Sequence, residues 1–93
     1  SMNSAIQELH KMRYAYRTLP PDPDEMNTTR ADLAMEALAA FILVSKTDTR
    51  DSIADLLCDL MHFCDRAKMD FDTELLKALS NYAEETEDDL DIF

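Results

Sequence analysis

The chain of 93 residues contains no glycine and no tryptophan, and it has only three prolines and two cysteines. Average usage would place about six glycines in a chain of this length. Hairpin turns in β-sheets depend on glycine, whereas helices do without it. The same absence excludes a glycine-rich loop that cradles phosphate groups. We therefore expect an all-α fold.

Basic residues are scarce as well: 9 Lys and Arg stand against 20 Asp and Glu, for a net charge of −11. Such a chain has no electrostatic reason to bind nucleic acid or an anionic membrane. Its longest apolar run, residues 37–44, is too short to span a bilayer. Cys58 and Cys64 share one predicted helix and point about 120° apart, so they cannot form a disulfide within it. We expect a cytoplasmic protein with buried free thiols, whose partners are cations or basic proteins.

Apolar residues at spacings of three and four predict four helices. We expect these helices over residues 3–18, 29–45, 49–67 and 72–86. The proline-rich segment 20–23 ends the first helix, and short connections favour an antiparallel four-helix bundle. Residues 1–86 then form a single helical domain, followed by an acidic tail at 87–93.

Capping residues mark the expected helix starts. Thr29 and Asp32 have the spacing of a capping box at the second helix. Either Asp48 or Thr49 caps the third helix, and Asp72 caps the fourth.

The two central helices carry more apolar residues than a four-helix monomer of this length needs. The segment 37–44 is apolar almost all round, which is typical of a helix buried on most sides. A chain this short also buries only about 60% of its unfolded surface. We expect a homodimer that buries a second apolar strip of helix 29–45, formed by Met35, Ala39 and Ile42.

The helix over 49–67 gathers polar side chains on one stripe, within about ±40° at about 100° per residue. This acidic stripe consists of Asp51, Asp55, Asp59, His62 and Arg66. Aspartates one turn apart repel each other by a few tenths of a kcal/mol. Water and salt, with His62 and Arg66 turned toward Asp59, could balance the charge; so could an arginine cluster of a partner, or a metal ion. The sequence leaves these three interpretations open.

A recognisable motif overlaps this stripe. Residues 55–66 read Asp-Leu-Leu-Cys-Asp-Leu-Met-His-Phe-Cys-Asp-Arg, and Asp-Phe-Asp follows at 70–72. The segment 51–85 resembles small all-α proteins of bacterial plasmids, integrative elements and phages, a family without an assigned activity. Those relatives usually have glycine in the turn after the Asp-Arg pair, where this chain has Ala67 and Lys68. We therefore expect Lys68 to adopt a left-handed conformation, at a cost of roughly 1 kcal/mol.

The same segment is more distantly similar to the last two helices of all-α nucleotide pyrophosphohydrolases. Those enzymes hold Mg²⁺ with an ExxE motif on one helix and an ExxD motif on the next. Asp55 falls at the ExxD aspartate, but Ser52 stands in place of its glutamate. On the preceding helix, Asp32 and Glu36 are four residues apart and not three as in ExxE, so at most half of the expected carboxylates are at matching positions. A Mg²⁺ site of this kind would be built from Asp32, Glu36, Asp55 and Asp59.

Two functional hypotheses follow, and a third possibility is a purely structural subunit whose partner is encoded beside it. We favour a non-catalytic accessory protein of a mobile element, without a cofactor, that binds a basic protein through its acidic stripe and tail. The alternative is a degenerate Mg²⁺-dependent enzyme similar to nucleotide pyrophosphohydrolases. Only the enzyme requires Asp32 and Glu36 to face the stripe.

Overall fold

The computed structural model describes residues 1–12 and 18–87. These residues form four α-helices and one 3-10 turn, with no strand among them. The elements are α1 Met2–His10, α2 Asn27–Ser45, η1 Thr49–Asp51, α3 Ser52–Ala67 and α4 Phe71–Thr86. The predicted all-α class is confirmed. No helix in the described ranges combines the length and the apolar character that crossing a membrane requires.

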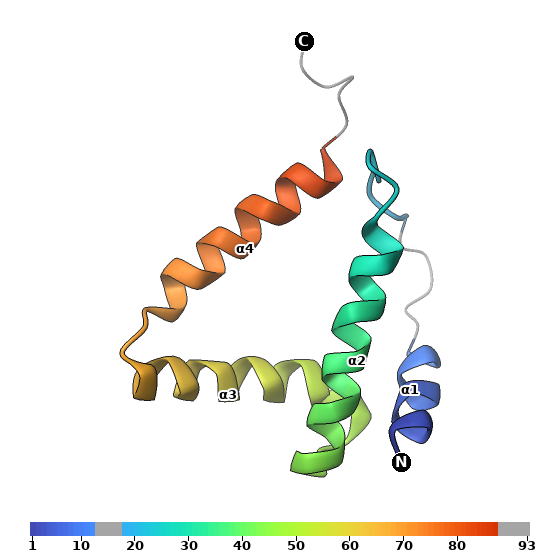
Figure 1. The fold of residues 1–93 in the computed structure, drawn as a ribbon, viewed down its shortest axis with the longest axis vertical. Coiled ribbons are helices and arrows are strands. Elements are labelled where there is room, and N and C mark those ends of the chain that lie inside the picture. The colour runs from blue at the N-terminus through green and yellow to red at the C-terminus, as the bar shows by residue number, and fades with distance from the viewer. Residues whose placement is uncertain (13–17, 88–93) are drawn as a thin grey trace.

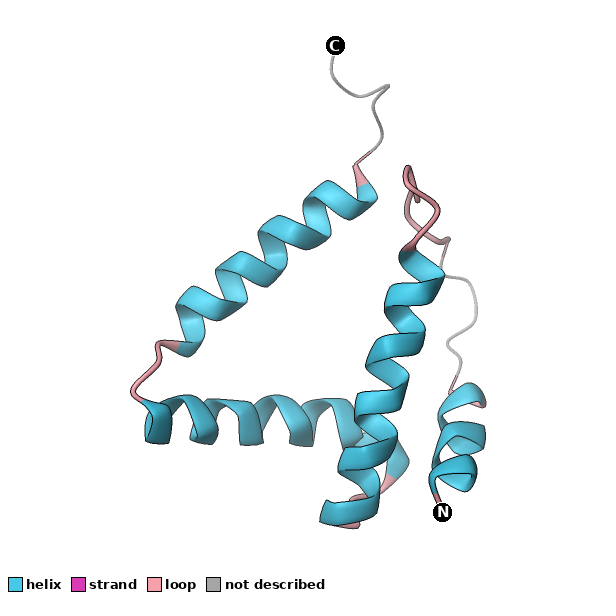
Figure 2. Cartoon of the chain, viewed as in Figure 1, coloured by secondary structure: helices cyan, strands magenta, loops and turns pink. Residues whose placement is uncertain are grey.

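The helices form an open frame (Figure 1). α1 runs antiparallel along α2, α3 crosses the C-terminal part of α2, and α4 turns back toward the start of α2. The three longer helices therefore follow the sides of a triangle, which Figure 2 shows in the same view. The antiparallel four-helix bundle that we predicted is not seen. α3 and α4 diverge from the turn that joins them instead of packing along their lengths.

Three of the four helix ranges agree with the predicted ones to within three residues. The exception is α1, which ends at His10 with Lys11 as its C-cap, before the predicted end at residue 18. The predicted residues 13–17, like the tail residues 88–93, lie outside the part that the structure describes. α4 ends at Thr86 with Glu87 as its C-cap, and the single domain over 1–86 stays a prediction.

The start of α2 differs from the predicted capping box. Met26 is the N-cap, and no side-chain cap is present there. The preceding loop supplies the acceptors instead: Asp24 Oδ1 accepts from the Met26 N–H and Asp22 Oδ1 from the Asn27 N–H, both at 3.2 Å. These aspartates satisfy two of the N–H groups that the start of a helix leaves without an intrahelical acceptor, and the predicted cap at Thr29 is not present.

The N-cap before α3 agrees with the prediction, and the N-cap of α4 differs from it. Asp48 begins the third helical segment, as predicted, and its Oδ1 accepts from the Arg50 N–H at 3.2 Å. The N-cap of α4 is Asp70 rather than Asp72. Asp70 Oδ2 accepts from the Thr73 hydroxyl at 2.6 Å, which ties the cap to the first turn.

The turn between α3 and α4 confirms the expected conformation of Lys68, which has φ 59° and ψ 37°. A side chain with a Cβ atom is strained in this region, and glycine is not. The Lys68 and Met69 N–H groups donate to Asp65 O and Cys64 O at 3.2 and 2.9 Å. The backbone therefore closes the end of α3 in the way that a glycine usually does.

Lys68→Gly is expected to raise the free energy of unfolding by about 1 kcal/mol, because it removes this strain. In a thermal melt the shift should be several degrees for a domain of this size. Lys68→Ala is the matched control, since it removes the charge but keeps the Cβ atom. A gain in Lys68→Ala equal to that in Lys68→Gly would attribute the effect to charge instead.

The small core lies between α1 and α2. Ala5, Leu9 and Ala39 are buried in it, and Ile6, Met12, Met35, Leu38 and Ile42 pack around them. The strip of Met35, Ala39 and Ile42 that we assigned to a dimer interface is thus covered by α1 of the same chain. Ala39 has no exposed surface at all, because its small side chain lets the two helices approach closely.

α2 is also less buried than its apolar composition predicts. Leu33 and Val44 are 63% and 82% exposed, and only Ala39 is buried. α1 covers one side of α2 and α3 reaches its C-terminal part. The remaining apolar surface of α2 is therefore open to solvent.

A polar corner joins the start of α2 to the end of α4. Arg30 Nε lies 3.1 Å from Glu85 Oε2, and Asn27 Nδ2 donates to Glu85 O at 2.9 Å. Arg30 also holds Asp24 with two hydrogen bonds of 2.8 and 3.0 Å. These bonds keep the pKa of Asp24 below its usual value and raise the pKa of Arg30. The triangle is thus closed at this corner by charge and hydrogen bonds, not by apolar packing.

Candidate functional site: the acidic side of α3

The acidic stripe follows one side of α3, as the sequence predicts. The helix is regular from Ser52 to Ala67, so residues spaced by three and four stay on one side. All five members, Asp51, Asp55, Asp59, His62 and Arg66, are exposed. Asp51 stands at the end of η1 and is the N-cap residue of α3, where its negative charge also complements the helix dipole.

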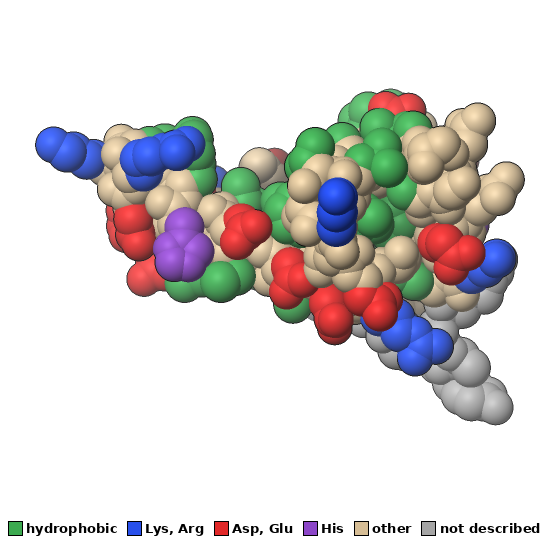
Figure 3. Space-filling model, turned by 90° about the horizontal axis from the view of Figure 1, so that it is seen from below, with side chains coloured by type: hydrophobic (Ala, Val, Ile, Leu, Met, Phe, Trp, Pro, Cys, Tyr) green, Lys and Arg blue, Asp and Glu red, His purple; other side chains and the backbone are tan. Residues whose placement is uncertain are grey.

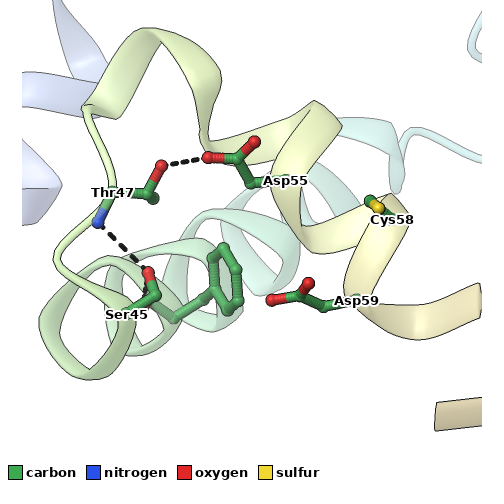
Figure 4. A pocket seen from close by; sticks show the side chains of 6 residues that line it. Ser45, Thr47, Asp55, Cys58 and Asp59 are labelled. Atoms are coloured by element: carbon green, nitrogen blue, oxygen red, sulfur yellow. Dashed lines mark hydrogen bonds between the residues drawn. The ribbon is translucent and has the colours of Figure 1, made fainter. Parts of the chain in front are cut away.

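A hollow at the corner between α2 and α3 includes the middle of the stripe (Figure 4). It is lined by Phe41, Ser45, Thr47, Asp55, Cys58 and Asp59. The Thr47 hydroxyl donates to Asp55 Oδ2, while the Thr47 N–H donates to Ser45 Oγ at 3.3 Å. Ser45 in turn donates to Phe41 O at 2.7 Å. The connection between α2 and α3 therefore fixes the position of Asp55.

Sequence reasoning missed Thr47 as a partner of Asp55. The two residues are eight positions apart on either side of a turn, and no helical spacing links them. It also placed both thiols in the interior, whereas Cys58 is exposed at this hollow and only Cys64 is buried. Both cysteines are free, as predicted.

A second hollow lies toward the C-terminal end of the stripe, lined by Asp59, His62, Phe63 and Arg66. The Arg66 guanidinium carbon is 5.6 Å from the centre of the Phe63 ring, which is a cation–π contact. Arg66 thus turns toward Phe63, where we had considered a contact with Asp59. Among the described residues, Asp51, Asp55 and Asp59 form no salt bridge with a basic side chain.

The four carboxylates of the alternative metal site do not converge. Within residues 1–12 and 18–87, no three His, Cys, Asp or Glu side chains gather closely enough to hold a metal ion. Asp55 and Asp59 share a hollow with Phe41 and Ser45 from the C-terminal end of α2. Glu36 lies five residues before Phe41 and nine before Ser45, about 8 and 13 Å along a helix, and Asp32 lies a further turn away. The described structure therefore does not gather these four carboxylates around one point.

Comparison of the chain with models of protein families, with curated proteins and with solved structures finds no match. The resemblance to proteins of mobile elements, and the fainter one to pyrophosphohydrolases, therefore rest on the sequence motif alone.

Proposed function

We propose that this chain is a non-catalytic interaction protein that binds a basic protein through the acidic stripe of α3. The observation that carries the proposal is the row formed by Asp51, Asp55 and Asp59. The three carboxylates are exposed and lack a basic partner within the described residues. They follow one another at intervals of about 6 Å along the helix.

Such a row suits a partner that presents arginines. A guanidinium group can bind a carboxylate with two parallel hydrogen bonds, which adds geometric specificity to the charge. The net charge of −11 would steer a basic partner toward the chain and raise its association rate. The motif resemblance suggests that this partner belongs to a mobile element in a bacterial cytoplasm.

Reversing two charges of the stripe tests the proposal. We expect Asp55→Lys/Asp59→Lys to weaken binding of a synthetic arginine-rich helical peptide by at least tenfold, about 1.4 kcal/mol. Fluorescence anisotropy with the labelled peptide at a fixed salt concentration measures the affinity. Asp59→Lys alone should give a smaller loss while it preserves the bond between Thr47 and Asp55.

The matched control is Asp32→Lys/Glu36→Lys, which makes the same change of charge at the same spacing on α2. Both of its sites are exposed and lie outside the stripe. A loss in the control equal to that in the α3 variant would mean that overall charge, and not the stripe, binds the peptide. That result would overturn the proposal.

A further inference from the structure

The apolar sides of α3 and α4 are uncovered in a single chain. On α3, Leu60 and Phe63 are 41% and 49% exposed, although a regular amphipathic helix normally buries this side. On α4, Leu76 and Leu79 are 66% and 55% exposed, and this helix has no buried residue. Figure 3 shows apolar side chains reaching the surface between the charged ones. Both helices thus lack the partner that their patterns require.

The surface area of the chain shows how much is uncovered. One chain exposes 7839 Å². A compact monomer of 10.7 kDa exposes about 5500 Å². The excess is about 2300 Å², whereas each partner in a standard protein interface contributes about 800 Å². The uncovered surface is therefore large enough for an obligate dimer, whose interfaces total about 2000–5000 Å².

The dimensions of the chain indicate the size of the missing partner. Its radius of gyration is 15.5 Å, and its extents are 47 × 35 × 20 Å. A compact chain of 93 residues has a radius of gyration of about 12 Å, and a compact globule of twice that length has one of about 16 Å. The radius of gyration of one chain is therefore already close to that of a compact globule of two chains. A second copy that fills the open frame would double the mass and hardly change the radius.

We propose that the apolar sides of α3 and α4 are covered by the same helices of a second copy, in an intertwined twofold dimer. In such an isologous interface one surface meets itself, so a charge of a single sign on it would face the same charge of the second copy. The apolar arc of α3, formed by Ile53, Leu56, Leu57, Leu60, Phe63 and Cys64, contains no acidic or basic residue. The acidic stripe lies on a different side of α3, adjoins the arc only at Phe63, and stays exposed in the dimer.

This dimer goes beyond the proposed binding of a basic protein and does not depend on it. It also moves the interface that we expected from the sequence. Met35, Ala39 and Ile42 pack against α1, and the surface that we assign to a second copy is that of α3 and α4, although Leu33 and Val44 of α2 are exposed as well.

Light scattering after size-exclusion chromatography, combined with small-angle X-ray scattering, tests the proposal on the unmodified chain. We expect a mass of about 21 kDa, twice the 10.7 kDa of one chain, at micromolar concentration. The radius of gyration should be about 16 Å. A mass of one chain at 100 micromolar would overturn the proposal. The apolar surface would then be a binding site for a different protein. A mass of two chains with a radius above about 20 Å would overturn the intertwined arrangement.

A pair of variants tests the surface itself. Leu76→Glu/Leu79→Glu should raise the dissociation constant of the dimer by at least 100-fold. Lys77→Gln/Asn81→Glu makes the same change of net charge at exposed positions on the other side of α4 and should leave the dimer intact. If both double variants raised the dissociation constant equally, or if neither raised it, the assignment of this surface would be contradicted. The mass and radius of the unmodified chain decide the proposal even if a variant fails to fold.

Discussion

Ala39→Asp is expected to lower the free energy of unfolding by about 3 kcal/mol or more, because it buries a carboxylate without a partner. Ala39 has no exposed surface, and its neighbours in the core of α1 and α2 are apolar. The larger side chain also forces the two helices apart. Urea denaturation followed by circular dichroism measures the change, at one fixed protein concentration because assembly would add to the stability.

Ala40→Asp is the matched control for this substitution, because Ala40 is the next residue of α2 and is exposed. Its cost should be limited to the lower helix propensity of aspartate, about 0.7 kcal/mol. The amide hydrogens of α1 should exchange faster in Ala39→Asp than in Ala40→Asp, since α1 is held mainly by this core. Equal stability of the two variants would contradict the position of α1 on α2.

Ser52→Glu is expected to lower the free energy of unfolding by about 3 kcal/mol, through overpacking and burial of a charge. Ser52 is fully buried, and its hydroxyl donates to Thr49 O at 2.7 Å. This is the position at which the pyrophosphohydrolase motif has a glutamate, so the variant introduces the carboxylate that the motif would require. The structure offers it no room, and we expect no rise in melting temperature when millimolar Mg²⁺ is added.

Two controls separate the causes in this experiment. Ser52→Ala removes the hydroxyl alone and should cost about 1 kcal/mol. Ala54→Glu adds the same carboxylate at an exposed position two residues further along α3. A stable Ser52→Glu protein with a Mg²⁺-dependent rise in melting temperature would instead support the enzyme hypothesis.

The sequence by itself determined the features that depend on neighbours along the chain. The absence of glycine and the apolar spacing were sufficient to predict the all-α class and three of the helix ranges. The cap formed by Asp48 and the left-handed Lys68 followed from local chemistry. The acidic stripe followed from the helical repeat, because residues of one regular helix share a side wherever that helix is placed.

Only the tertiary structure decided which apolar surfaces meet. The pattern of α2 is apolar almost all round, so it does not say that α1 would cover Ala39 or that Val44 would stay exposed. The antiparallel bundle was not confirmed, because amphipathic helices joined by a short connection can pack on each other or diverge. The crossing of α2 and α3 places the Thr47 hydroxyl within hydrogen-bond distance of Asp55. It does not bring Asp32 into a cluster of metal-binding side chains with Asp55 within the described residues. The hydrophobic effect that orders such helices is nondirectional, so their arrangement depends on the whole set of contacts and not on any one segment.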